Sequence, residues 1–259
     1  MFLDFTGDES IPVLPQECFA SENEYEQWLC LEPYFKALVR KTSARYAISE
    51  LKGLSYNPLF PLEAEQNRAI VDNCHFLAHY IGEAVLEKYD FDVGKAFTSC
   101  EFGCSEGCFH GVMAGHIRRE ADPNVVLSEI GILCDTVPVR MPNVPGTRVE
   151  DEEDFKAQCA HGIGHGLAAH GFMSIPEASE ACQRLNNEYY ERKCEDGVMM
   201  EHVERYLTLE ESKLKEILPE ICAPFKDLSG GVENKYKKCQ EKALYWSSTV
   251  WNRARMHKE

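Results

Sequence analysis

The sequence lacks any run of eighteen apolar residues and any excess of basic side chains. Without such a run, it contains no candidate membrane-spanning helix. The formal net charge is −16, and no basic stripe offsets it. This balance argues against nucleic acid and anionic lipid as partners, because like charges repel. The chain also has no Gly-x-Ser-x-Gly, phosphate-binding-loop or dinucleotide-binding motif. We therefore expect no nucleic acid partner, no membrane insertion and none of the enzyme classes that these motifs mark.

The alternation of apolar and polar residues that is typical of a strand is also missing, whereas helical spacing is frequent. Leu77, Ile81 and Val85, for example, fall on one stripe of a helix. The predicted fold class is all-α, with two tandem helical repeats related by a pseudo-twofold axis. We expect one integrated domain whose parts are an N-terminal helical segment (1–61), a first repeat (62–135), a linker (136–150), a second repeat (151–222) and a C-terminal helix (223–259).

Cysteine, in contrast, is abundant, with twelve in 259 residues. The even number and the high density favour structural disulfides in a secreted or periplasmic protein. Cys100 with Cys108 and Cys182 with Cys194 are equivalent candidate pairs. The alternative is thiolate metal ligands, although the usual two Cys-x2-Cys motifs are missing. No signal peptide is visible, since the first nine residues carry acids where a leader carries Lys or Arg. Either the protein stays inside the cell or a leader has been removed.

Six of the nine histidines repeat in two copies of one pattern, at an interval of 86 positions. The six are His75, His79, His116, His161, His165 and His202. Flanking residues repeat as well, because positions 108–116 and 194–202 share a Cys, a Gly-Val-Met segment and the final His. A lone helical His is more often a hydrogen-bonded core residue than a ligand. The repetition favours a metal site.

Two histidines four residues apart lie on one face of a helix and can aim two imidazoles at one ion. A third His from a neighbouring helix completes a triad and leaves coordination positions open for water, oxygen or substrate. We therefore predict a symmetric metal site made of two triads, which is dinuclear if the triads converge.

The two copies differ at two positions that carry chemistry. His110 in the first copy corresponds to Asp196 in the second, and Gly115 corresponds to Glu201. We take His110, Asp196 and Glu201 as candidate catalytic residues. Glu201 is a candidate general base, and Asp196 is a candidate base or carboxylate ligand. In the alternative interpretation, His110 and Asp196 hold the ligand imidazoles by hydrogen bonds.

The pattern His-x3-His, followed 37 residues later by a third His and present twice on helices, resembles the site of type 3 copper proteins, the hemocyanin and tyrosinase group. The resemblance covers the six repeated histidines. It implies a four-helix bundle in which two His triads hold a copper pair that binds dioxygen. Since imidazole ligands also suit zinc and iron, copper is the favoured metal among several transition metals.

The predicted function is that of a metal-dependent oxidoreductase, which uses dioxygen to oxidise a small molecule or a peptide side chain. One alternative is a zinc-dependent hydrolase, in which Glu201 or Asp196 takes a proton from metal-bound water. The other alternative is a non-catalytic, secreted metal-binding or interaction domain.

Overall fold

The computed structural model describes residues 11–21, 24–56, 68–101, 103–104, 106–120, 122–135, 137, 152–206, 209, 211–226, 228 and 234–256. Over these residues the chain forms eleven α-helices and five short 3-10 helices, with no strand. The all-α prediction is therefore confirmed. The predicted linker at 136–150 lies outside the described residues, except for Val137. Among the described helices, none combines the length and the apolar character needed to cross a membrane.

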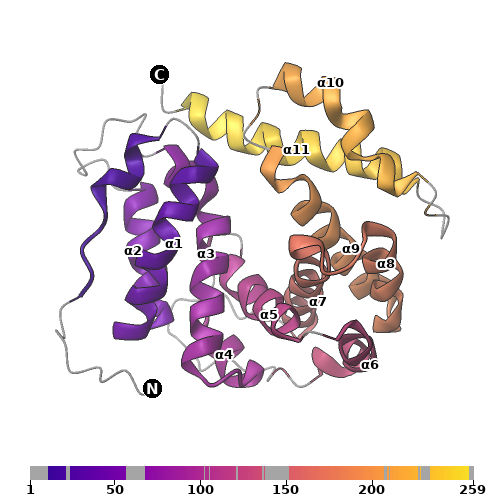
Figure 1. The fold of residues 1–259 in the computed structure, drawn as a ribbon, viewed down its shortest axis with the longest axis horizontal. Helices are drawn as coiled ribbons and strands as arrows, with labels where there is room; N and C mark the ends of the chain where they lie inside the picture. The colour runs from indigo at the N-terminus through magenta and orange to yellow at the C-terminus, as the bar shows by residue number, and fades with distance from the viewer. Residues whose placement is uncertain are drawn as a thin grey trace.

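Four helices lie in a row, in chain order, at the centre of the molecule (Figure 1). α3 (Arg68–Lys88) packs against α5 (Gly107–Arg119), α5 against α7 (Glu152–Ala168), and α7 against α9 (Glu188–Val203). Between the described parts of α3 and α9 there is no comparable contact, so the row does not close into a bundle. α5 thus separates the two helices that carry the paired histidines. The relation of the halves by a pseudo-twofold axis stays a prediction.

One end of the row is covered by α1 (Glu24–Lys41) and α2 (Ala44–Tyr56), which pack against α3. Trp28 on α1 is almost fully buried, and its ring centroid lies 5.0 Å from that of Phe76 on α3. Burying such a side chain contributes about 1.5–3 kcal/mol. Apolar packing against α1 and α2 therefore fixes the position of α3.

The remaining helices pack around the row at different places. α4 (Val93–Ser99) contacts α3 and α5, and α8 (Ile175–Cys182) packs against α7 and α9. α6 (Pro123–Leu133) contacts α8 and the 3-10 helix at Gln183–Leu185. α10 (Glu211–Ile221) packs against α11 (Lys235–Met256). Figure 1 shows α11 crossing from α9 to α3, and both helices contact it.

Several helices begin where the sequence supplies a capping side chain. Asp122 accepts a hydrogen bond from the backbone of α6 and is followed by Pro123, a residue that is favoured at the first helical position. Ser174 and Glu177 form a capping box at the start of α8. These caps satisfy backbone N–H groups that a helix leaves without partners in its first turn.

All twelve cysteines are paired. The disulfides are Cys18–Cys30, Cys74–Cys104, Cys100–Cys108, Cys134–Cys159, Cys182–Cys194 and Cys222–Cys239. The two candidate pairs predicted from the sequence are both confirmed. Because no thiolate is left to bind a metal, the alternative use of cysteine does not apply. Six disulfides indicate an oxidising environment of the extracellular type.

Glycines bring the helices of the row into backbone contact. A Cβ atom placed on Gly111 of α5 would lie 2.0 Å from the carbonyl oxygen of His79, and one on Gly197 of α9 would lie 2.1 Å from that of His161. No real side chain tolerates this distance, so only glycine permits the approach. The same type of contact therefore joins α3 to α5 and α7 to α9.

These contacts relate the two halves by an offset that differs between helices. Gly111 and Gly197 are 86 positions apart, whereas the histidines that they meet, His79 and His161, are 82 positions apart. By packing, His79 therefore corresponds to His161 and not to His165. The two close contacts thus differ by four residues, about one helical turn, from the spacing of the sequence repeat.

Candidate metal centre

Five imidazoles from three helices meet in the middle of the row. α3 supplies His75 and His79, α5 supplies His110, and α7 supplies His161 and His165. The ring centroids in contact lie 4.5–6.1 Å apart. His79, His110 and His165 are buried, and the other two are partly buried. We refer to these five residues as the histidine cluster.

Nitrogen atoms of the cluster lie at distances that suit one ion. His75, His79, His110 and His165 each offer one ligand atom, and these four atoms lie within 4.8 Å of one another. The Nε2 atoms of His75 and His79 are 3.1 Å apart, and those of His161 and His165 are 3.2 Å apart. Two nitrogens bound at about 2.0–2.1 Å to one ion, at an angle of about 90–110°, are about 2.9–3.4 Å apart. Both pairs therefore already have the required separation.

Hydrogen bonds from outside the cluster fix the proton positions of two rings. The Nδ1–H group of His75 donates to the carbonyl oxygen of Cys104 at 3.1 Å. That of His161 donates to the carbonyl oxygen of Lys193, also at 3.1 Å. In a neutral imidazole with its proton on Nδ1, Nε2 carries a lone pair. Both Nε2 atoms thus carry the lone pair that a metal ligand needs. A hydrogen bond from the other ring nitrogen to a carbonyl oxygen is typical of histidine ligands.

Glu201 provides the same support for His165. Its carboxylate accepts a hydrogen bond from Nδ1–H of His165 at 2.9 Å. Because this contact is at Nδ1, Glu201 lies on the far side of the ring from His161, whose Nε2 faces Nε2 of His165. Glu201 therefore orients a ring of the cluster. It does not lie where a general base beside a metal-bound water would lie.

The surroundings favour the neutral form of four rings of the cluster. Burial lowers the pKa of His165 to about 3. Burial and then the neighbouring imidazoles lower the pKa values of His79, His110 and His161 well below their ordinary range. A neutral imidazole is the form that binds a metal ion. Metal ligation near neutral pH thus requires no loss of protons from these rings.

Disulfides anchor the backbone beside the cluster. Cys74 precedes His75 and is bonded to Cys104, whose carbonyl oxygen accepts the hydrogen bond from that ring. Cys108 and Cys159 are each bonded in a disulfide and each lie two residues before a cluster histidine. Covalent links therefore fix all three helices close to the site.

A cleft of about 580 Å³ lies next to the cluster and is lined by His79 and Glu201. Its other polar lining residues are Tyr80, Glu83, Arg118, Ser174, His202 and Glu204. Arg118 forms an ion pair with Glu83. Burial and the nearby Glu201 carboxylate raise the pKa of Glu204. Since His79 belongs to both the cluster and the cleft wall, a small molecule in the cleft lies beside the site.

The structure does not bring His116 and His202 into the cluster. His116 lines a separate hollow with Glu120 and Glu129. His202 donates from Nε2 to the carbonyl oxygen of Ile221 at 2.8 Å. Residues six apart on an α-helix differ by about 600° in direction, so His116 points about 120° away from His110. The two predicted triads are thus replaced by five histidines, in which His110 takes the place expected for His116.

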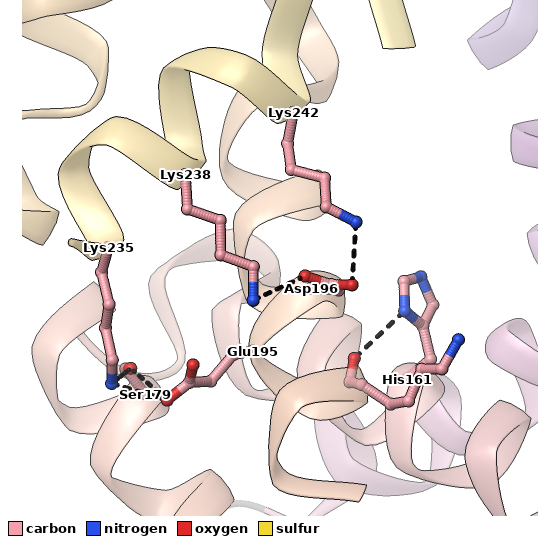
Figure 2. A network of polar contacts seen from close by, with 8 residues as sticks. His161, Ser179, Glu195, Asp196, Lys235, Lys238 and Lys242 are labelled. Atoms are coloured by element: carbon pink, nitrogen blue, oxygen red, sulfur yellow. Dashed lines mark hydrogen bonds and ion pairs between the residues drawn. The ribbon is translucent and has the colours of Figure 1, made fainter. Parts of the chain in front are cut away.

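Asp196 lies near His161 but is engaged by lysines of α11 (Figure 2). Nζ of Lys242 lies 3.0 Å from one carboxylate oxygen of Asp196, and Nζ of Lys238 lies 3.3 Å from the other. Burial alone would raise the pKa of Asp196, but the two ammonium groups outweigh it and lower the pKa. Next to it, Glu195 pairs with Lys235 at 2.6 Å. These ion pairs attach α11 to α9. They engage the two oxygens with which Asp196 would bind a metal or accept a proton.

From the sequence, His110 was predicted to be a catalytic residue or to hold a ligand imidazole by a hydrogen bond. Its membership of the cluster was not predicted. The available signal was the spacing of small residues around it. Gly107 and Gly111 face the backbone of α3, and a residue three or four positions from each shares that side of the helix. His110 lies three positions after Gly107 and next to Gly111, so it falls near the close contact with His75 and His79.

Comparisons of the chain with protein-family models, with curated proteins and with solved structures find no match.

Proposed function

We propose that the protein binds one transition-metal ion in the histidine cluster, with copper favoured and zinc or iron as the other candidates. One observation carries this proposal. His161 and His165 direct their Nε2 lone pairs at each other across 3.2 Å, because each ring donates its Nδ1–H elsewhere. Two facing lone pairs need a cation between them. Because burial opposes protonation of both rings, a metal ion is a better candidate for this cation than a proton.

The chemistry of the ligands favours a transition metal. Imidazole suits copper, zinc, iron and nickel, whereas magnesium, calcium and manganese prefer carboxylate and carbonyl oxygens. The four groups that converge within 4.8 Å are all imidazoles. Among divalent ions of the first transition row, copper binds such sites most tightly, which supports it as the favoured metal. Five histidines support a single ion, since two triads would need six.

A second function, oxygen-dependent oxidation of a small molecule or a peptide side chain, is favoured by the cleft. His79 lines the cleft as well as the cluster, so a substrate there would lie close to the ion. The position of Glu201 behind His165 gives less support to a zinc-dependent hydrolase, because its carboxylate faces away from the ion. A non-catalytic metal-binding domain is the alternative if the cleft takes no substrate.

Electron paramagnetic resonance of the protein with one equivalent of Cu²⁺ tests the first proposal. The expected spectrum shows coupling of the copper to several nitrogen nuclei and is lost in His165→Ala. A spectrum with oxygen ligands only, or one unchanged in the variant, would overturn it. For the second function, oxygen consumption with small phenol and amine substrates is expected to depend on copper and on His79. Consumption equal to that of free copper would rule it out.

A further inference from the structure

The two nitrogens of His110 are in unlike states. Nε2 lies 2.7 Å from Oε1 of Gln158, whereas Nδ1 is buried and has no hydrogen-bond partner in the described structure. The whole side chain is only 3% exposed. A buried polar nitrogen without a partner costs free energy, and such atoms are rare in folded proteins. The buried Nδ1 of His110 is therefore expected to have a binding partner.

The contact with Gln158 determines which nitrogen holds the proton. A carboxamide oxygen only accepts hydrogen bonds, so Nε2 of His110 must be the donor. A second proton, on Nδ1, would be a buried donor without an acceptor on a charged ring that is almost fully buried, so the geometry favours the neutral ring. A neutral ring with its proton on Nε2 has its lone pair on Nδ1. The unpartnered atom is thus an acceptor.

Four imidazoles surround the ring of His110. The ring of His110 lies 4.5 Å from that of His161, centroid to centroid, and is stacked on His165 at 5.6 Å. The rings of His75 and His79 lie at 5.2 Å and 5.8 Å. An ion held by these histidines is the natural partner of Nδ1.

We propose that His110 binds the metal through Nδ1, and that Gln158 is the positioning residue which sets this tautomer. This inference rests on the proposed metal site. The other rings with known proton positions, His75, His161 and His165, present Nε2 instead. The site then has mixed ligation, and Gln158 ties the ligand of α5 to α7. Because Gln158 lies three residues before His161 on α7, one helix supplies both a ligand and the support for another.

The tautomers are read directly from long-range ¹H–¹⁵N correlation spectra of the metal-free protein. We expect the Nε2–H form for His110 and the Nδ1–H form for His75, His161 and His165. In Gln158→Leu the preference of His110 for Nε2–H is expected to be lost, whereas Gln158→Glu keeps an acceptor oxygen and the tautomer. Gln183→Leu, at an exposed glutamine outside the cluster, is the matched control and should leave every tautomer unchanged.

Zinc, which is diamagnetic, serves as the metal probe in the same spectra. On addition of Zn²⁺, the Nδ1 resonance of His110 should shift as a ligand, together with the Nε2 resonance of His165. Loss of an outer hydrogen-bond partner typically weakens metal binding about 10–100-fold, so Gln158→Leu should raise the Kd for zinc by that factor. Gln183→Leu should not change it.

The outcomes separate this inference from the proposed function. Zinc binding with His110 in the Nδ1–H form overturns the inference and leaves the metal site standing. The predicted tautomer without zinc or copper binding overturns the proposed function and, with it, ligation through Nδ1. Should Gln158→Leu fail to fold, the wild-type spectra with and without zinc still decide between Nδ1 and Nε2 as the ligand of His110.

Discussion

Nε2 of His161 and Nε2 of His165 face each other at 3.2 Å, and each ring donates its Nδ1–H group to an oxygen outside the cluster. This relationship is unfavourable between two neutral rings unless a cation lies between them. The surrounding fold maintains it through close helix contacts and disulfides. The pair therefore marks the cluster as a site built for a ligand.

Substitution of cluster histidines should remove metal binding, while substitution of the other repeated histidines should not. His79→Ala and His165→Ala each delete a nitrogen of the cluster, so bound copper or zinc should fall to background in an elemental analysis. His116→Ala and His202→Ala are the matched controls for metal binding, since neither imidazole belongs to the cluster and Nε2 of His202 donates to the carbonyl oxygen of Ile221. Equal loss in all four variants would favour the two triads expected from the sequence repeat.

Glu201→Ala should weaken metal binding about 10–100-fold, because His165 loses the carboxylate that orients its ring. The measurement is a competition titration with a chelator of known affinity. Asp196→Asn is the control: it removes a charge that pairs with α11 and should leave the metal affinity within about 2-fold. If the two variants lose affinity equally, the assignment of Glu201 to His165 is wrong.

The metal-free protein should lose stability as the pH falls. The pKa of His165 is about 3 in the folded state, below the ordinary value of 6.5, so the unfolded chain binds more protons between these pH values. The contribution is present above about pH 6.5 and is lost progressively on acidification. For His165 alone, we expect the free energy of unfolding to fall by about 2 kcal/mol from pH 7 to pH 5.

Urea unfolding with a chelator present, at both pH values, measures this loss. His165→Leu should show a smaller difference between pH 7 and pH 5 than the wild type. A wild-type free energy of unfolding that is the same at both values would contradict the neutral state of the cluster.

Gly111→Ala should destabilise the protein by about 1–3 kcal/mol, because the new Cβ atom would meet the carbonyl oxygen of His79 at 2.0 Å. Metal affinity should fall as well, since α5 must move away from α3. Gly53→Ala is the control within a helix: its Cβ atom meets nothing within 4 Å, and the change should stabilise by up to about 1 kcal/mol. Thermal melts of both variants test this pair, and a harmless Gly111→Ala would disprove the close packing.

Much of the fold follows from local patterns in the sequence. Helical periodicity, the Asp122–Pro123 start of α6 and the disulfides Cys100–Cys108 and Cys182–Cys194 were all predictable, because each depends on residues close in the chain. The order in which α3, α5, α7 and α9 pack depends on contacts between distant segments. No local pattern encodes this order.

The site was predictable for the pairs with i, i+4 spacing, and this spacing does place His75 with His79 and His161 with His165. The third histidine was not predictable in this way, because the sequence repeat favoured His116. Which side of α5 faces α3 is decided by Gly107 and Gly111, and this side carries His110. His116 lies six residues after His110 and therefore points about 120° away from it.

Native mass spectrometry of the intact, disulfide-bonded protein with Cu²⁺ or Zn²⁺ tests the central claim most directly. We predict one ion bound per chain in the wild type and in His116→Ala, and none in His165→Ala. Absence of a bound ion in the wild type, or the same stoichiometry in all three proteins, would contradict a metal site in the histidine cluster.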